Sequence, residues 1–197
     1  FTYTGRFEAP EGYKVLSNGL GEFDGQAWSY TLEQDLGNYL VMLAVAPYKE
    51  RLDSWRGQPV RQWYPPDVSE ASVEHVSGKV PEMLELFSQL TAFDYPYPIY
   101  TEVFVQRFLY AGMENTTTTI QEQRLLHPDN VQQTREWPEE VVAHEIAHQW
   151  YGDLLTCRAW RELWLNEGFA TFMASDYITE RQPSDAARDA YWARSVP

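Results

Sequence analysis

The residues best suited to chemistry lie in one short run, His144-Glu145-Ile146-Ala147-His148. Two histidines four positions apart lie on one face of an α-helix, so both imidazoles can bind the same metal ion. Glu145 leans toward that ion and can accept a proton from a metal-bound water. Random shuffling of this composition gives the pattern H-E-x-x-H with an expectation of roughly 0.01. The match therefore indicates a metal-dependent function.

The sequence around this run predicts the helix that must hold it. Pro138 suits a first helical position, and Glu139 and Glu140 then fall in the first turn, where the helix dipole favours acidic side chains. Val142 and Ile146 supply an apolar stripe that would anchor the helix on a core. Taken alone, the pattern would also fit a helix with two hydrogen-bonded histidines and an exposed glutamate.

A candidate third ligand lies downstream in the segment 163–170, which reads L-W-L-N-E-G-F-A. Its glutamate, Glu167, follows His148 after eighteen intervening residues, which leaves room for a turn and a second helix. A catalytic zinc site needs three protein ligands and an open position for water. His144, His148 and Glu167 therefore form a candidate His₂Glu set for one zinc ion per chain, and such a set suits hydrolysis.

Three motifs, in this order along the chain, resemble the aminopeptidase N family of zinc metallopeptidases in the gluzincin clan. They are A-G-M-E-N at 111–115, standing where the family has G-A-M-E-N, then H-E-I-A-H-Q-W-Y-G-D at 144–153 and L-W-L-N-E-G-F-A at 163–170. The resemblance runs from about Tyr39 to about Asp176, which is most of the chain.

The resemblance implies an α+β fold. The expected catalytic domain is thermolysin-like, with a small mixed sheet and helices that carry the zinc site, and a few strands of an N-terminal β-sandwich domain precede it. Residues 1–50, where Gly and Pro punctuate β-like runs, are assigned to the tail end of that β-domain. Residues 51–197 are assigned to the N-terminal part of the catalytic domain, so we expect a fragment truncated at its C-terminus.

The segment Ala111-Gly112-Met113-Glu114-Asn115 is the candidate substrate-binding site. We expect it at a sheet edge near the zinc, where an extended peptide could pair as an added strand. Gly112 would let the substrate backbone approach closely. Glu114 could take the peptide's terminal ammonium in a charge-assisted hydrogen bond, and the family's glutamate at this position has that role.

The resemblance implies a zinc-dependent aminopeptidase that hydrolyses the N-terminal peptide bond, with zinc-bound water as nucleophile and Glu145 as general base. In the family a tyrosine well beyond the zinc glutamate helps hold the oxyanion. Only Tyr177 and Tyr191 follow Glu167 here, and Ala174 stands where many members have a second glutamate. We therefore expect the chain alone to bind zinc and to turn over poorly.

Two alternatives stay open. One is a catalytically impaired zinc-binding scaffold or interaction domain of the same family, although the zinc and base residues are all intact. The other is a zinc endopeptidase, which Glu114 disfavours because an anchor for a terminal amine would obstruct a chain that runs through the site.

Alternating and β-branched runs predict the strands. These are Gly5–Pro10, Lys14–Ser17, Gln26–Gln34, Tyr39–Val45, Gln58–Tyr64, Thr101–Leu109 and Thr116–Gln121.

Helical spacing predicts a helix that ends at Thr91, with Asp67 or Ser69 as its N-terminal cap. Pro81 is expected to kink or break it. The second zinc helix is predicted over 161–178, and a last helix from Asp185 to about Arg194, capped by Ser184.

Two further predictions concern residues close in sequence to the candidate zinc ligands. Phe169, Phe172 and Met173 are core candidates on the second zinc helix. Asp153 and Glu162 are acids that could orient the zinc histidines.

The composition fits a globular protein, and the net charge of -14 argues against nucleic acid or an anionic membrane as a partner. No apolar run reaches the length of a membrane span. The expected partner is a peptide with a free N-terminus, and the oligomeric state stays open.

Cys157 is the single cysteine, so no internal disulfide can form. The compartment is undecided, with the cytoplasm favoured on that ground.

Overall fold

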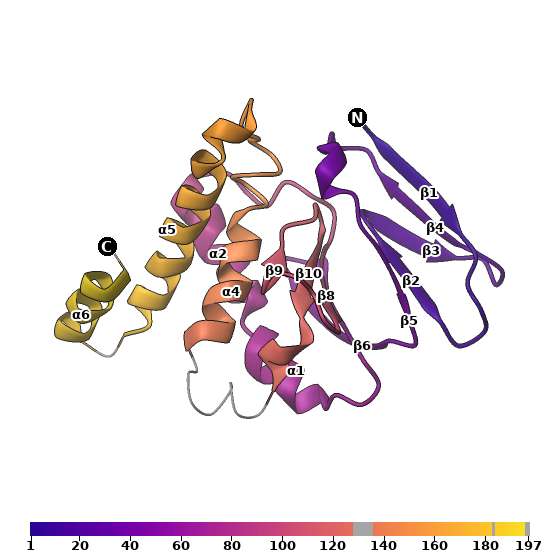
Figure 1. Ribbon diagram of the computed structural model, residues 1–197, viewed down its shortest axis with the longest axis horizontal. Helices are drawn as coiled ribbons and strands as arrows, with labels where there is room; N and C mark the ends of the chain where they lie inside the picture. Colours follow the sequence, from indigo (N-terminus) through magenta and orange to yellow (C-terminus); the bar gives the residue numbers. More distant parts are fainter. Residues whose placement is uncertain (128–135, 183, 196–197) are drawn as a thin grey trace.

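The computed structural model describes residues 1–127, 136–182 and 184–195. Figure 1 shows the N-terminal strands at one end of the molecule, a sheet in the middle and the long helices at the other end. The fold is therefore α+β, as the resemblance implies. Within the described ranges, no helix combines the length and the apolar character that a membrane crossing requires.

Residues 3–46 form two small antiparallel sheets, one in the order β1-β4-β3 and one that pairs β2 with β5. The predicted strand Tyr39–Val45 is wrong in its first half. There Asn38–Leu40 forms a 3-10 turn, η1, because the Leu40 N–H donates to the Gly37 carbonyl at 3.1 Å while the Leu40 side chain is buried. The strands are β1 Tyr3–Phe7, β2 Lys14–Ser17, β3 Leu20–Phe23, β4 Trp28–Leu32 and β5 Leu43–Ala46.

The central sheet is mixed, with the order β6-β7-β8-β10-β9. β8 is parallel to both β7 and β10, whereas β6 and β9 pair antiparallel with their neighbours at the two edges. β6 was not predicted, because this edge strand is rich in charged residues and lacks an apolar alternation. The strands of this central sheet are β6 Lys49–Trp55, β7 Gln58–Tyr64, β8 Tyr100–Val105, β9 Gly112–Met113 and β10 Thr118–Glu122.

A kink or break is expected at Pro81, and the structure interrupts the helix just before it, at Gly78 and Lys79, so that two helices form. Ser69 caps the first through a bond from the Ser72 N–H, and Pro81 lies in the first turn of the second. The helices are α1 Glu70–Ser77, α2 Val80–Thr91, α4 Glu136–Ala147, α5 Trp164–Glu180 and α6 Asp185–Ser195, with 3-10 turns η2 Gln123–Leu126 and η3 Trp160–Glu162.

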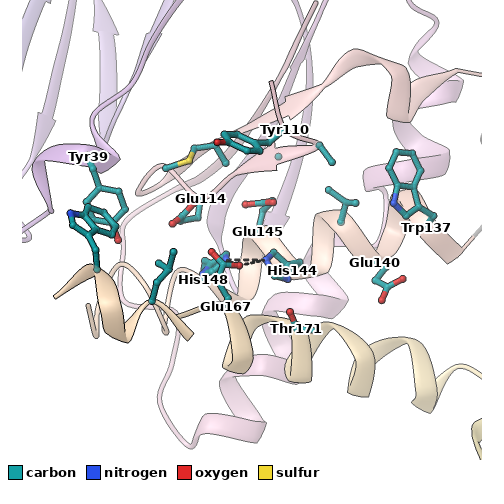
Figure 2. Close-up of a pocket in the computed structure, with 16 residues that line it drawn as sticks. Tyr39, Tyr110, Glu114, Trp137, Glu140, His144, Glu145, His148, Glu167 and Thr171 are labelled. Carbon is teal, nitrogen blue, oxygen red and sulfur yellow. Dashed lines mark hydrogen bonds and ion pairs between the residues drawn. The ribbon is translucent and has the colours of Figure 1, made fainter. Parts of the chain in front are cut away.

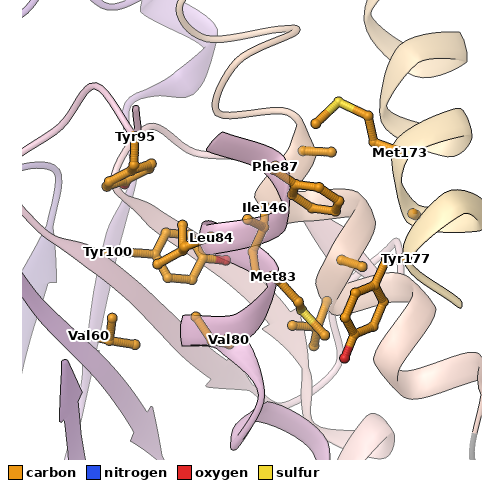
Figure 3. Packing of buried hydrophobic residues seen from close by; sticks show 14 of the residues in the cluster. Val60, Val80, Met83, Leu84, Phe87, Tyr95, Tyr100, Ile146, Met173 and Tyr177 are labelled. Carbon is orange, nitrogen blue, oxygen red and sulfur yellow. The ribbon is translucent and has the colours of Figure 1, made fainter. Parts of the chain in front are cut away.

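A buried apolar cluster fixes α4 and α5 relative to the sheet (Figure 3). Phe87 of α2, Ile146 of α4 and Met173 of α5 are each buried in it, and α4 packs along α5. The prediction that Phe169 and Phe172 belong to the core is wrong, because both side chains are about half exposed on the outer side of α5. Each instead contacts another aromatic ring near the surface.

Candidate active site

The three predicted zinc ligands meet at one point between α4 and α5 (Figure 2). The His144 and His148 Nε2 atoms are 3.0 Å apart, and one carboxylate oxygen of Glu167 lies 3.3 Å from the first and 3.6 Å from the second. His144 lies in helix α4, and His148 follows the last residue of that helix directly. Glu167 lies in the first turn of α5.

This triangle of atoms has the size that a zinc ion needs. Ligands at about 2.0–2.1 Å from a tetrahedral ion lie roughly 3.3 Å from one another. The three distances here, 3.0, 3.3 and 3.6 Å, bracket that value. Two imidazole nitrogens and a carboxylate oxygen are also a donor set that zinc accepts, so the residues present fit the metal.

A backbone carbonyl, and not an acid, orients His148. Its Nδ1–H donates to the Tyr151 carbonyl at 3.0 Å, which leaves Nε2 free to bind a metal. Gly152 lies against this ring, and a β-carbon there would stand 3.0 Å from Nδ1. The orienting role predicted for Asp153 and Glu162 is not seen, since neither carboxylate hydrogen bonds a zinc histidine within the described residues.

Charge is concentrated among the ligands. Contact with His144 and His148 holds the pKa of the Glu167 carboxyl well below its usual range. Burial alone would lower the pKa of His148, but Glu167, Glu114 and Glu145 outweigh burial and raise that pKa to about 9. The site is strongly electronegative, which suits a divalent cation.

Glu145 faces the same space from the face of α4 next to β9. Its side chain is buried, and burial raises the pKa of its carboxyl to about 8, an effect that Glu114 and Glu167 strengthen and His148 opposes. Gly112 of β9 lies so close that a β-carbon there would stand 2.4 Å from a Glu145 carboxylate oxygen. A side chain at position 112 would therefore displace Glu145, and close approach of a substrate backbone stays a prediction.

Glu114 lies beside Glu145 and His148, with ligand atoms of all three within 4.8 Å of one another. A residue that the sequence reasoning missed, Gln149, fixes this arrangement. Its Nε2 donates to the Glu114 carbonyl at 3.0 Å and its Oε1 accepts from the Thr117 N–H at 2.9 Å. Gln149 follows the second zinc histidine directly, and that position was the only signal in the sequence.

A cleft of about 750 Å³ runs over the zinc ligands. Sequence reasoning missed its aromatic walls: Tyr39 and Trp160 meet edge to face at 5.0 Å at one end, and Trp137 lies at the other (Figure 2). The Tyr39 hydroxyl donates to the Gly152 carbonyl at 3.2 Å.

The predicted substrate segment contributes unevenly to the cleft. Ala111, Gly112, Met113 and Glu114 line it, and β9 lies at the sheet edge as expected. Asn115 is not part of the lining, because its side chain is buried and its Nδ2 donates to the Leu40 carbonyl at 3.2 Å.

Comparison with known proteins places the chain in a family. A model described as the peptidase family M1 domain matches residues 76–196. Aminopeptidase N of Streptomyces lividans is 29% identical over 178 residues, which cover 87% of this chain and 21% of that protein. Glutamyl aminopeptidase of Sus scrofa is 31% identical over 181 residues, which cover 87% of this chain and 19% of that protein. Aminopeptidase 2 of Candida albicans is 35% identical over 144 residues, which cover 71% of this chain and 15% of that protein.

The chain thus spans about one fifth of the length of these relatives. A crystal structure of a two-domain M1 zinc metallopeptidase bound to L-arginine shares its fold, with a TM-score of 0.76 and 23% identity over 98% of this chain and 44% of that one. The resemblance to the aminopeptidase N family is confirmed. Because the family model matches more than half of the sequence, the chain belongs to peptidase family M1.

Proposed function

We propose that this chain carries the active site of a zinc aminopeptidase that removes the first residue of peptides with a free N-terminus. One observation carries the proposal: a His₂Glu ligand set, a buried glutamate and a second glutamate that can hold an ammonium group all line one cleft. The names of the relatives, all aminopeptidases, support the same class of reaction.

Zinc held by His144, His148 and Glu167 would supply a Lewis acid and lower the pKa of water. The chain's own residues supply the rest. Glu145 lies within reach of a water beside the ligands and can take its proton, then deliver a proton to the leaving amine. The buried Glu114 carboxylate can bind the substrate ammonium, which fixes the first peptide bond next to Glu145.

A matched pair of peptides tests the proposal. One tetrapeptide has a free α-amine and its twin is N-acetylated, and mass spectrometry identifies the products. We expect only the free peptide to lose its first residue. Glu114→Gln should lower kcat/KM for the free peptide roughly 30-fold or more, because one partner of a desolvated charge pair is lost. Glu22→Gln, which removes an equal charge from an exposed strand, is the control. Internal cleavage of the acetylated peptide would favour the endopeptidase alternative.

One observation favours a second candidate, an impaired zinc-binding scaffold. Neither downstream tyrosine lines the cleft, since Tyr177 is buried in the core and the Tyr191 hydroxyl donates to Glu140 at 2.8 Å. No tyrosine beyond Glu167 is thus placed to hold an oxyanion within the described residues. Zinc binding without cleavage, both in this chain and in any longer natural polypeptide that contains it, would establish the scaffold.

A further inference from the structure

We propose that Glu140 selects substrates whose second residue carries a positive charge, so that the preferred peptides have lysine or arginine immediately after the cleaved bond. The inference rests on the proposed aminopeptidase function and adds a substrate class to it. Three observations support it: the position of Glu140 in the cleft, the direction in which a bound peptide must run, and the absence of a partner cation for Glu140 within residues 1–127, 136–182 and 184–195.

Glu140 lies on α4 four residues before His144, so it lies on the same side of the helix as that ligand. It lines the cleft together with Trp137 and Val141. Figure 2 places Trp137 and Glu140 at the end of the cleft opposite Tyr39, with His144 and Glu145 between.

The anchor at Glu114 sets the direction of the substrate. In Figure 2 Glu114 lies on the Tyr39 side of Glu145. A peptide whose ammonium binds Glu114 presents its first peptide bond to Glu145 and the zinc ligands, and the rest of the chain must continue past His144. The next side chain beyond the cleaved bond therefore comes closest to Trp137 and Glu140.

A hydrogen bond holds the Glu140 carboxylate in place. The Tyr191 hydroxyl of α6 donates to its Oε1 at 2.8 Å, and Ser175 lies 3.5 Å from the same hydroxyl. The adjacent Glu139 differs sharply: its carboxylate contacts Lys79 at 2.7 Å and Arg181 at 3.8 Å. No such cation pairs with Glu140 among the described residues.

The cleft as a whole reinforces this selectivity. Its charged lining consists of four glutamates and two histidines, with no lysine or arginine among the described residues. A cationic side chain at the Glu140 end would gain a partner, and an acidic one would meet repulsion. The aromatic ring of Trp137 adds a surface on which the side chain's methylene groups can pack.

The test compares three free-amine tripeptides, Ala-Lys-Ala, Ala-norleucine-Ala and Ala-Glu-Ala, in the longest natural polypeptide that contains this sequence. Norleucine has the lysine side chain's four carbons without its ammonium group. We expect kcat/KM to be about fivefold higher for lysine than for norleucine, with glutamate lower still, as for a partly exposed ion pair. In Glu140→Gln the lysine-to-norleucine ratio should fall to about one.

Two controls isolate the charge of Glu140. Glu22→Gln removes one negative charge far from the cleft and should leave the ratio at its wild-type value. Raising the salt concentration should shrink the ratio in wild type and leave it unchanged in Glu140→Gln.

A binding measurement separates this proposal from the proposed function. Calorimetry on Glu145→Gln compares the affinities of the same peptides whether or not the protein cleaves them. Failure to cleave any peptide would refute the aminopeptidase, but tighter binding of the lysine peptide by about fivefold would still support the role of Glu140. Equal affinities for the lysine and norleucine peptides, or a preference that survives Glu140→Gln, would overturn it.

Discussion

Two buried glutamates in this protein have carboxyl groups of nearly the same pKa but lie in very different surroundings. Glu145 on α4 and Glu102 on β8 each have a carboxyl whose pKa burial raises to about 8. Around Glu102, the neighbours Ser77, Gln62 and Arg51 oppose that effect. Around Glu145, His148 opposes it while Glu114 and Glu167 strengthen it.

The difference lies in access and in partners. Glu145 lines a cleft of about 750 Å³ beside a set of metal ligands, whereas Glu102 is fully buried between the sheet and α1 and does not line that cleft. A raised pKa therefore reports burial, and only the geometry of the surroundings makes Glu145 a candidate base.

The largest expected effect separates the two glutamates by activity. Glu145→Gln should lower kcat roughly 10³-fold while zinc stays bound, because the general base is lost and the ligands remain. Glu102→Gln should keep kcat within about a factor of two, since its carboxyl lies outside the cleft. The measurement is kcat for a peptide with a free α-amine, determined by steady-state kinetics for both variants and wild type. Equal losses in the two variants would show that burial, and not position, is what matters.

A second prediction concerns the fit between β9 and α4. In Gly112→Ala the new methyl group would stand 2.4 Å from the Glu145 carboxylate, so that side chain must move. Because a displacement of about 1 Å can cost roughly 10²-fold in rate, we expect kcat/KM to fall about 10- to 100-fold. Gly168→Ala, where a β-carbon meets no atom within 4 Å, is the matched control. Wild-type activity in Gly112→Ala would show that Glu145 need not occupy its present position.

The smallest expected effect is on the pH dependence of stability. The folded-state pKa of Glu102 is about 8, against an ordinary 4.5, so between these values the folded chain holds a proton that the unfolded chain releases. The free energy of unfolding should therefore fall as pH rises through this window, by about 1.4 kcal/mol per pH unit from this group. Glu102→Gln should remove that share of the slope in urea unfolding between pH 5 and about 8. An unchanged slope would contradict the burial of a protonated Glu102.

The parts of the site that could be predicted are those set by local spacing. His144 and His148 share a helix face by periodicity alone, and the stretch before Glu167 is long enough to form a turn into a second helix. The interruption of the helix just before Pro81 also follows from local chemistry, because proline suits the first turn of a helix and not its interior. These features depend on backbone geometry within a few turns of chain.

The parts that could not be predicted depend on contacts between distant segments. Tyr39 reaches Gly152 across 113 positions, and Gln149 reaches the Glu114 carbonyl across 35. Strand β6 is an edge strand whose charged residues hide it from a search for apolar alternation. Phe169 looks like a core residue from its type, but the chain places it against Tyr151 near the surface.

The central claim is that His144, His148 and Glu167 hold a zinc ion beside Glu145. The most direct test uses the longest natural polypeptide that contains this sequence, as wild type, Glu145→Gln and His148→Ala. Mass spectrometry measures the zinc content per chain after dialysis, and peptide hydrolysis is assayed on the same samples. We predict one zinc in wild type and in Glu145→Gln, hydrolysis only in wild type, and no zinc in His148→Ala. A wild-type chain without zinc, or a His148→Ala chain that keeps it, would contradict the account.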